Sequence, residues 1–186
     1  MTEHDPHVEA PNSAKLVEAI IYVAKRSATD PHFGLVKLNK ILFCADFNHY
    51  ARTGKTITGY RYRRYPKGPA LDQWFEIKQE LHRGYYPLRI ETRQRGTHEQ
   101  QRIVALRRHK RRSLSRAEMA TLRRMIKRFS KMTATQMIDL SHGFLGWQSA
   151  RPYEVIPLET VYLSSQKFTD KELAYGRRYT ASLQPA

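Results

Sequence analysis

Hydrophobic residues recur every three or four positions in two segments, residues 13–26 and 33–52. This spacing predicts two helices, the first capped by Asn12 or Ser13. The second segment is apolar around most of its circumference and ends before Gly54, a residue typical of helix termination. A helix that is apolar on most sides belongs in the centre of a fold, so we expect residues 33–52 to form the core helix.

The pattern changes after the core helix. Residues 55–69 predict an extended stretch that ends in a turn rich in proline and glycine. A helix is expected over residues 70–82, with Trp74 and Phe75 on its buried side.

Alternating apolar and polar positions predict a hairpin from residues 86–95 and 100–107. Further helices are predicted over residues 115–131, 133–140, 141–148 and 169–180, with an irregular or extended stretch over 151–165. The expected fold class is therefore mainly α with a small antiparallel β-hairpin (α+β). We expect a flexible N-terminal tail over residues 1–12 and a compact single-domain helical bundle over 13–182.

The chain is strongly basic, with 33 Lys and Arg against 17 Asp and Glu and a net charge of +16. Such a charge attracts nucleic acid, an anionic membrane or an acidic protein. No segment is long and apolar enough to span a membrane, and no signal peptide is recognisable, so the expected compartment is cytoplasmic. The single cysteine, Cys44, lies in an apolar run and is expected to be a small buried residue.

The core helix carries a polar stripe of Asn39, Asp46 and Tyr50, which fall within about 40° of one another at helical spacing. A hydrogen-bond network to neighbouring segments is favoured over a ligand or partner site. Asp46 and His49 have a spacing that could ligate a metal, but only the fold could bring a third ligand such as His142 close. No metal is therefore expected.

Catalytic machinery is not recognisable. Ser141 and His142 are adjacent, so on a helix their side chains point about 100° apart, which does not suit a nucleophile and its base. Phosphate-loop, dinucleotide-binding and zinc-protease motifs are missing from the sequence. We expect no enzyme activity and no cofactor.

Two basic clusters are candidates for binding. The first interleaves arginines with tyrosines and comprises Arg61, Arg63 and Arg64 with Tyr60, Tyr62 and Tyr65. The second comprises Arg107, Arg108, Lys110, Arg111 and Arg112. Tyrosine can stack on bases and arginine can pair with phosphates, yet both residues are also common at protein interfaces. A solvated surface, a protein partner and nucleic acid therefore all remain open.

One ordered set of motifs resembles a known family. The core helix reads LNKILFCADFNHY over residues 38–50 and is followed by Gly54, by Ile-Thr-Gly at 57–59, and by Gly68-Pro69. Further on come Leu-Ser-His at 140–142 and Trp147. This order is similar to the Panacea domain of SocA-like antitoxins, which also includes phage-associated GepA-type proteins. The resemblance covers roughly residues 13–165.

The resemblance implies a mostly helical domain without known catalysis, which neutralises a toxin by direct contact. One type of member acts as an adaptor that delivers a toxin to a protease. The expected partner is a cognate toxin encoded by an adjacent gene, and a basic nucleic-acid-binding protein is the alternative. The motif positions are Asp46, His49, Gly59, Tyr62, Tyr65, Gly68, Pro69, Ser141, His142 and Trp147. We expect most of them to hold the fold, with Asp46 and the Ser141-His142 pair bridging the core helix to the later helix.

Overall fold

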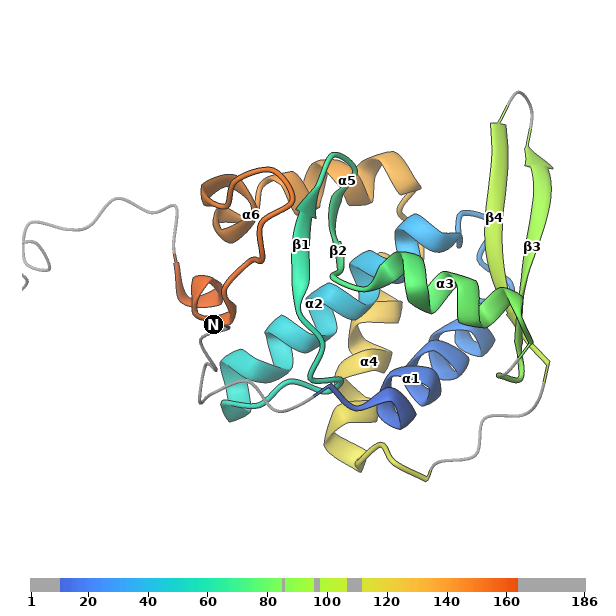
Figure 1. The fold of residues 1–186 in the computed structure, drawn as a ribbon, viewed down its shortest axis with the longest axis horizontal. Helices are drawn as coiled ribbons and strands as arrows, with labels where there is room; N and C mark the ends of the chain where they lie inside the picture. Colours follow the sequence, from blue (N-terminus) through green and yellow to red (C-terminus); the bar gives the residue numbers. More distant parts are fainter. Residues whose placement is uncertain (1–10, 85, 96–97, 107–111, 164–186) are drawn as a thin grey trace, which may run out of the picture.

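The apolar helix predicted for the core lies at the centre of the fold. A computed structural model describes residues 11–84, 86–95, 98–106 and 112–163, and α2 (Leu35–Thr53) crosses its middle (Figure 1). Every residue from 37 to 43 is buried, and this run of nearly two turns faces all directions around the helix. The elements in contact with α2 include α1 (Ser13–Arg26), α4 (Arg116–Phe129), α5 (Ala134–His142) and strand β2 (Gly68–Leu71).

The surrounding helices begin where the sequence supplies capping residues. Asn12 accepts a hydrogen bond from the first turn of α1. Ser115 and Glu118 form a capping box at α4, and Thr133 and Gln136 form another at α5. These side chains satisfy backbone N–H groups that have no partner within the helix. The predicted starts of all three helices are therefore confirmed.

The segment after α2 forms an additional hairpin, which the sequence analysis did not predict. Strands β1 (Tyr62–Tyr65) and β2 (Gly68–Leu71) are antiparallel, with Tyr65 opposite Gly68. The helix expected over residues 70–82 is therefore shorter, and α3 runs from Trp74 to His82. The first residues of the expected helix form β2 instead, because their backbone groups bond to the preceding strand and to α2.

The expected burial of Phe75 is wrong. Its side chain is 68% exposed, and Trp74 beside it is half-buried. In α3 only Leu81 is buried, so this helix lies at the edge of the core. Because α3 lies at the edge of the core, Phe75 remains at the surface although the apolar pattern predicted its burial.

The second hairpin pairs β3 (Leu88–Arg95) with β4 (His98–Ala105), as the alternating pattern predicts. In β4, Arg102 is 4% exposed and donates to the carbonyls of Ser27 (2.9 Å), Ala28 (2.5 Å) and Asp30 (2.8 Å). These carbonyls belong to the connection between α1 and α2. The buried guanidinium therefore attaches the hairpin to the chain that leads into the central helix.

The last described elements are α6 (Leu145–Ser149) and a short 3-10 helix, η1 (Leu158–Tyr162). The described residues form six α-helices and two small antiparallel sheets, which confirms a mainly α fold with antiparallel hairpins. The predicted helix over 169–180 and residues 1–10 of the predicted tail lie outside the described residues. In the described ranges no helix has the length and apolar character that crossing a membrane requires.

Candidate functional site

Asp46 holds the loop that follows α2. Its carboxylate is fully buried and accepts hydrogen bonds from the backbone N–H groups of Ile57 (2.7 Å) and Thr58 (3.0 Å). The hydroxyls of Thr58 and Tyr62 each donate to it at 2.6 Å. Burial raises the pKa of the Asp46 carboxyl, and the hydrogen bonds from Thr58 and Tyr62 oppose that rise. Asp46 is thus fully occupied within the protein.

The loop bound by Asp46 contains the Ile-Thr-Gly motif. Gly59 has a φ of 71°, in the left-handed region that favours glycine, and its N–H donates to the Thr56 hydroxyl at 3.0 Å. The carbonyl of Thr58 accepts from the N–H of Asn12 at 2.9 Å, just before α1. The motif therefore ties the end of α2 to the start of α1.

Two further polar side chains of α2 hold the β1–β2 hairpin. The Asn39 Oδ1 atom accepts from the N–H of Leu71 at 3.2 Å, and Lys40 Nζ donates to the carbonyl of Pro69 at 2.7 Å. Burial lowers the pKa of the Lys40 ammonium to about 7 and raises the pKa of the nearby Cys44 thiol to about 12. Cys44 is only partly buried, rather than buried as expected, and it packs against the core.

Gly68 lies where the hairpin meets both α2 and α5. Its φ is 83°, and a Cβ atom built on it would clash with Ser141 Oγ and lie 2.8 Å from Lys40 Cε. Ser141 is buried and donates to the carbonyl of Ile138 at 2.8 Å within α5. The glycine of the Gly-Pro motif therefore forms the turn and also allows the hairpin to lie close to α2 and α5.

The β1–β2 hairpin, α2 and α3 line an open cleft of about 490 Å³, which we call the hairpin cleft. Its walls are mostly apolar and include Val36, Pro66, Trp74 and Phe75, and Lys40 is among the lining residues. Cavities of a few hundred cubic ångströms with apolar walls and few polar groups are typical of binding sites. The hairpin cleft is therefore the candidate site of this fold.

His142 and Trp147 belong to a stack on the other side of the hairpin. Their rings are parallel with centroids 4.0 Å apart, and the Arg64 guanidinium lies 4.3 Å from the Trp147 ring. The Trp147 indole N–H donates to the carbonyl of Tyr65 at 3.4 Å. This stack attaches α5 and α6 to β1, which is a structural role for the Ser-His and tryptophan motif.

The expected bridge from Asp46 to Ser141 and His142 is wrong. Among the described residues, Asp46 accepts hydrogen bonds only from the loop and Tyr62, whereas Ser141 faces Gly68 and His142 stacks on Trp147. The prediction grouped these three residues because all belong to the motif set. In the structure Asp46 bonds to Tyr62 of β1 and Ser141 lies against Gly68 of β2, so the hairpin connects them indirectly. Asp46, Ser141 and Trp147 instead contact the loop or the hairpin separately.

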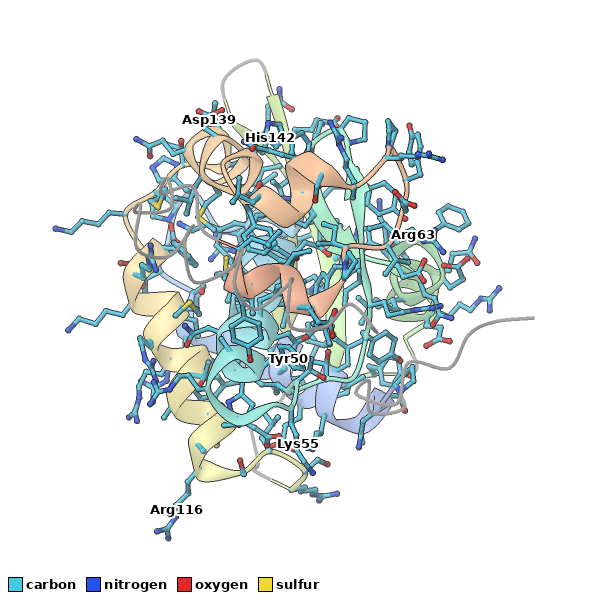
Figure 2. The ribbon with its side chains drawn as sticks, turned by 90° about the vertical axis from the view of Figure 1, so that its left-hand side faces the viewer. Tyr50, Lys55, Arg63, Arg116, Asp139 and His142 are labelled. Atoms are coloured by element: carbon cyan, nitrogen blue, oxygen red, sulfur yellow. The ribbon has the colours of Figure 1, made fainter. Side chains whose placement is uncertain are left out.

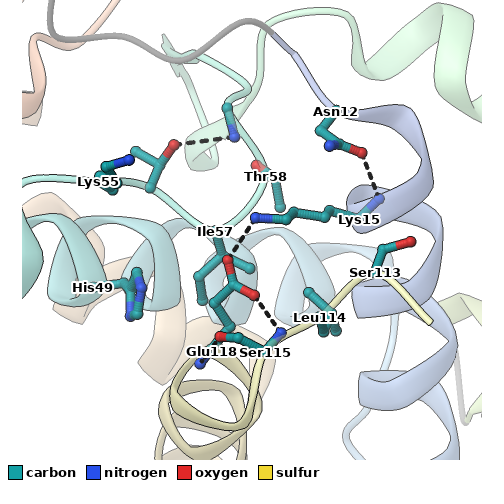
Figure 3. Close-up of polar contacts among 12 residues, drawn as sticks. Asn12, Lys15, His49, Lys55, Ile57, Thr58, Ser113, Leu114, Ser115 and Glu118 are labelled. Atoms are coloured by element: carbon teal, nitrogen blue, oxygen red, sulfur yellow. Dashed lines mark hydrogen bonds and ion pairs between the residues drawn. The ribbon is translucent and has the colours of Figure 1, made fainter. Parts of the chain in front are cut away.

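Figure 3 shows that His49 lies beside the start of α4. Its Nδ1 atom is 3.4 Å from the Thr121 hydroxyl, and burial lowers the pKa of the imidazole. Lys15 reaches across from α1 and pairs with Glu118 at 2.7 Å, while Glu118 also accepts from the Ser115 N–H at 2.6 Å. In the described ranges there is no group of three or more His, Cys, Asp or Glu residues that could hold a metal ion.

The interleaved arginines and tyrosines make mostly internal contacts. Arg63 binds Asp72 and donates to the carbonyl of Tyr153 at 2.8 Å, and Arg64 donates to the carbonyl of Ala150 at 2.6 Å. Tyr62 is 1% exposed and cannot stack on a base. Only Arg61, whose side chain is 54% exposed, remains largely in solvent, 3.4 Å from Asp72.

The second basic cluster is mostly outside the described residues, which exclude Arg107, Arg108, Lys110 and Arg111. Arg112 is described, and its backbone N–H donates to the buried carboxylate of Glu18 at 3.1 Å.

Sequence reasoning missed the two lysines of α2. Lys37 and Lys40 are 1% and 2% exposed, yet the sequence analysis assigned no role to Lys37, and Lys40 figured only as part of the motif over residues 38–50. A usable signal was present, since a lysine inside a helix predicted to be apolar on most sides must be paired or line a cavity. The same argument identified Asn39 and Asp46, and it applies equally to the two lysines.

Comparison with known proteins gives one family. The family model described as antitoxin SocA-like, Panacea domain, matches residues 38–148, which is more than half of the chain. Searches of curated proteins and of solved structures found no match. The matched range begins in α2 and ends in α6, so it contains Asp46, the hairpin and the stacked His142 and Trp147.

Replacing Asp46 with asparagine should destabilise the protein by about 3 kcal/mol, because an amide can accept on one oxygen only and leaves buried donors unpaired. Urea unfolding would measure the change. Asp139→Asn, at an exposed position of α5, is the control and should change stability by less than about 0.5 kcal/mol. Equal stability of the two variants would contradict the role assigned to Asp46.

Replacing Gly68 with alanine should destabilise the protein more than the same change at Gly54. Both glycines have a positive φ, of 83° and 72°, but no atom lies within 4 Å of a Cβ at Gly54. Gly54→Ala therefore measures backbone strain alone, about 1 kcal/mol, and Gly68→Ala adds the clash with Ser141 and Lys40, about 1–3 kcal/mol more. Thermal melts of both variants would show whether the close approach matters.

Proposed function

The chain belongs to the family of SocA-like antitoxins with a Panacea domain, and on this premise we propose that it neutralises a cognate toxin by direct protein–protein contact. The match over residues 38–148 is the observation that carries the proposal. It includes the α2 core, the loop held by Asp46 and most of the hairpin-cleft lining. The toxin is expected to be encoded by an adjacent gene.

The roles of the motif residues support a binding function rather than a chemical one. Asp46, Asn39 and Gly68 are occupied in holding the loop and the hairpin, and Ser141 donates to a helix carbonyl. Exposed aromatic side chains remain at the surface beside this framework, including Phe75 at 68% and Tyr153 at 58%. Exposed aromatic groups on a rigid framework are typical of protein-binding surfaces.

Co-expression tests the proposal directly. The product of the adjacent gene, expressed alone, should stop growth, and co-expression of this chain should restore it. The two proteins should then co-purify as a complex. A toxic neighbour whose effect persists with the chain present at equal or higher level would contradict the proposal. The toxin half-life separates the two modes, because blocking leaves it unchanged and delivery to a protease shortens it.

A second candidate function, nucleic-acid binding, is favoured by the outer face of α4. In Figure 2 Arg116 projects outward from one end of this helix. Exposed basic residues continue along α4 and just beyond it: Arg123, Arg124, Lys127, Arg128 and Lys131. This surface, together with a net charge of +16, fits contact with phosphates.

The salt dependence of binding checks this second function. Fluorescence anisotropy with a 20-nucleotide single strand should show binding at 50 mM salt that weakens steeply by 200 mM. At 50 mM salt, the double variant Arg123→Gln with Lys127→Gln should bind the strand more weakly than the unmodified chain does. The control is Arg89→Gln with Arg93→Gln on β3, where both arginines pair with Glu91. Absence of binding at 50 mM salt would exclude this function.

A further inference from the structure

Two buried lysines on α2 differ in how their ammonium groups are satisfied. Lys37 pairs with Asp30 at 2.7 Å and donates to the carbonyl of Met132 at 2.6 Å. Lys40 is 2% exposed, and its one bond to a described residue is the donation to Pro69. An ammonium has three N–H donors, so two donors of Lys40 lack an acceptor in the described ranges. A buried cation in this condition calls for an acceptor from outside.

The surroundings of Lys40 favour an anionic group attached to an apolar one. The lining of the hairpin cleft contains no Asp or Glu but includes two more lysines, Lys67 and Lys78. Trp74 and Phe75 provide aromatic surface in the same lining. The cleft therefore combines positive charge with apolar walls.

We propose that the hairpin cleft binds a segment of the partner protein in which an Asp or Glu side chain lies beside an aromatic or long aliphatic side chain. The carboxylate accepts hydrogen bonds from Lys40, and the apolar side chain packs against Trp74 and Phe75. This inference rests on the proposed function, since the toxin is the protein that would carry the segment. A protein segment is favoured over a small acid because it can also cover Phe75, which is 68% exposed.

The charge state of Lys40 gives the site a pH dependence. Burial lowers the pKa of Lys40 to about 7. Below pH 7 the ammonium is charged and can bind a carboxylate, whereas above pH 7 the neutral amine no longer attracts it. The elements packed around Lys40 carry the following other charged and titratable groups: Lys37, Cys44, Asp46, His49, Tyr50 and Arg52 of α2, Tyr62, Arg63, Arg64, Tyr65 and Lys67 of the hairpin, Glu76, Lys78, Glu80 and His82 of α3, and Asp139 and His142 of α5. Glu76 and Asp139 are exposed, and no carboxylate pairs with Lys40 in the described ranges.

A small probe tests the cleft without any toxin. In ligand-observed NMR, 3-phenylpropionate should bind the full chain at pH 6, whereas the neutral 3-phenylpropan-1-ol should bind at least tenfold more weakly. Raising the pH from 6 to 8.5 should weaken binding of the acid at least tenfold, because the protonated fraction of Lys40 falls roughly tenfold per unit above its pKa. Equal binding of acid and alcohol, or binding of the acid that is unchanged by pH, would overturn the proposal.

Variants assign the effect to Lys40. Lys40→Met should lose the preference for the acid and its pH dependence, while Lys127→Met, at an exposed position of α4 outside the cleft lining, should keep both and change the affinity about twofold at most. Retention of the preference in a folded Lys40→Met protein would overturn the assignment. The pH series on the unmodified chain remains decisive if this variant does not fold.

The toxin experiment separates this inference from the proposed function. Lys40→Met and Phe75→Ala should each weaken co-purification with the toxin at least tenfold, and 3-phenylpropionate should compete with it. If the unmodified chain neutralises the toxin and both folded variants do so equally well, the cleft is not the contact site and only this inference fails. Probe binding without any effect on the toxin would indicate a site for a small acid, which also overturns it.

Discussion

The burial of α2 on all sides is the constraint on which the rest of the structure depends. A helix surrounded by protein has no solvent to satisfy its polar side chains, so each must find a partner in another segment. Asp46 does so most completely, with four donors from the loop and β1. Asn39 binds the backbone of β2, and the Tyr50 hydroxyl donates to Glu159 of η1 at 3.0 Å. The polar groups of one helix thus position three separate segments.

This arrangement explains how so small a sheet persists. A two-stranded hairpin of four residues per strand is marginal by itself. Here β1–β2 is held on one side by Asn39 and Lys40 of α2 and on the other by the stack of Arg64 on Trp147. The backbone of the hairpin bonds to side chains from distant parts of the chain. Its geometry, and with it the shape of the hairpin cleft, follows from the central helix.

Much of the fold could be predicted because its signals are local. The apolar circumference of residues 33–52 indicated a central helix, and the Ser115–Glu118 spacing indicated the start of α4. The polar stripe of Asn39, Asp46 and Tyr50 also indicated a network, because buried polar groups need partners.

The features that were missed depend on partners far away in the sequence. The expected helix began too early because the N–H of Leu71 bonds to Asn39, thirty-two residues earlier. The interleaved arginines have the composition of a nucleic-acid surface, but Arg64 donates to the carbonyl of Ala150, eighty-six residues away. The exposure of Phe75 follows from the position of α3 at the core edge, which periodicity alone does not reveal. Local patterns identify elements, but tertiary contacts decide which faces remain free.

Different residues hold the fold and form the exposed edge of the hairpin cleft. Asp46 is buried and bound by the loop and β1, so a partner cannot contact it without unfolding the loop. In the proposed function, the partner contacts the edge of the framework, where Phe75 and Lys67 are exposed. Substitutions at that edge would change the partner and leave the framework intact, because the edge side chains contribute little to the core. Lys40 is the exception, since it belongs to the framework through Pro69 and borders the cleft at the same time. Lys40 therefore affects both the stability of the hairpin and the charge of the groups that the cleft can bind.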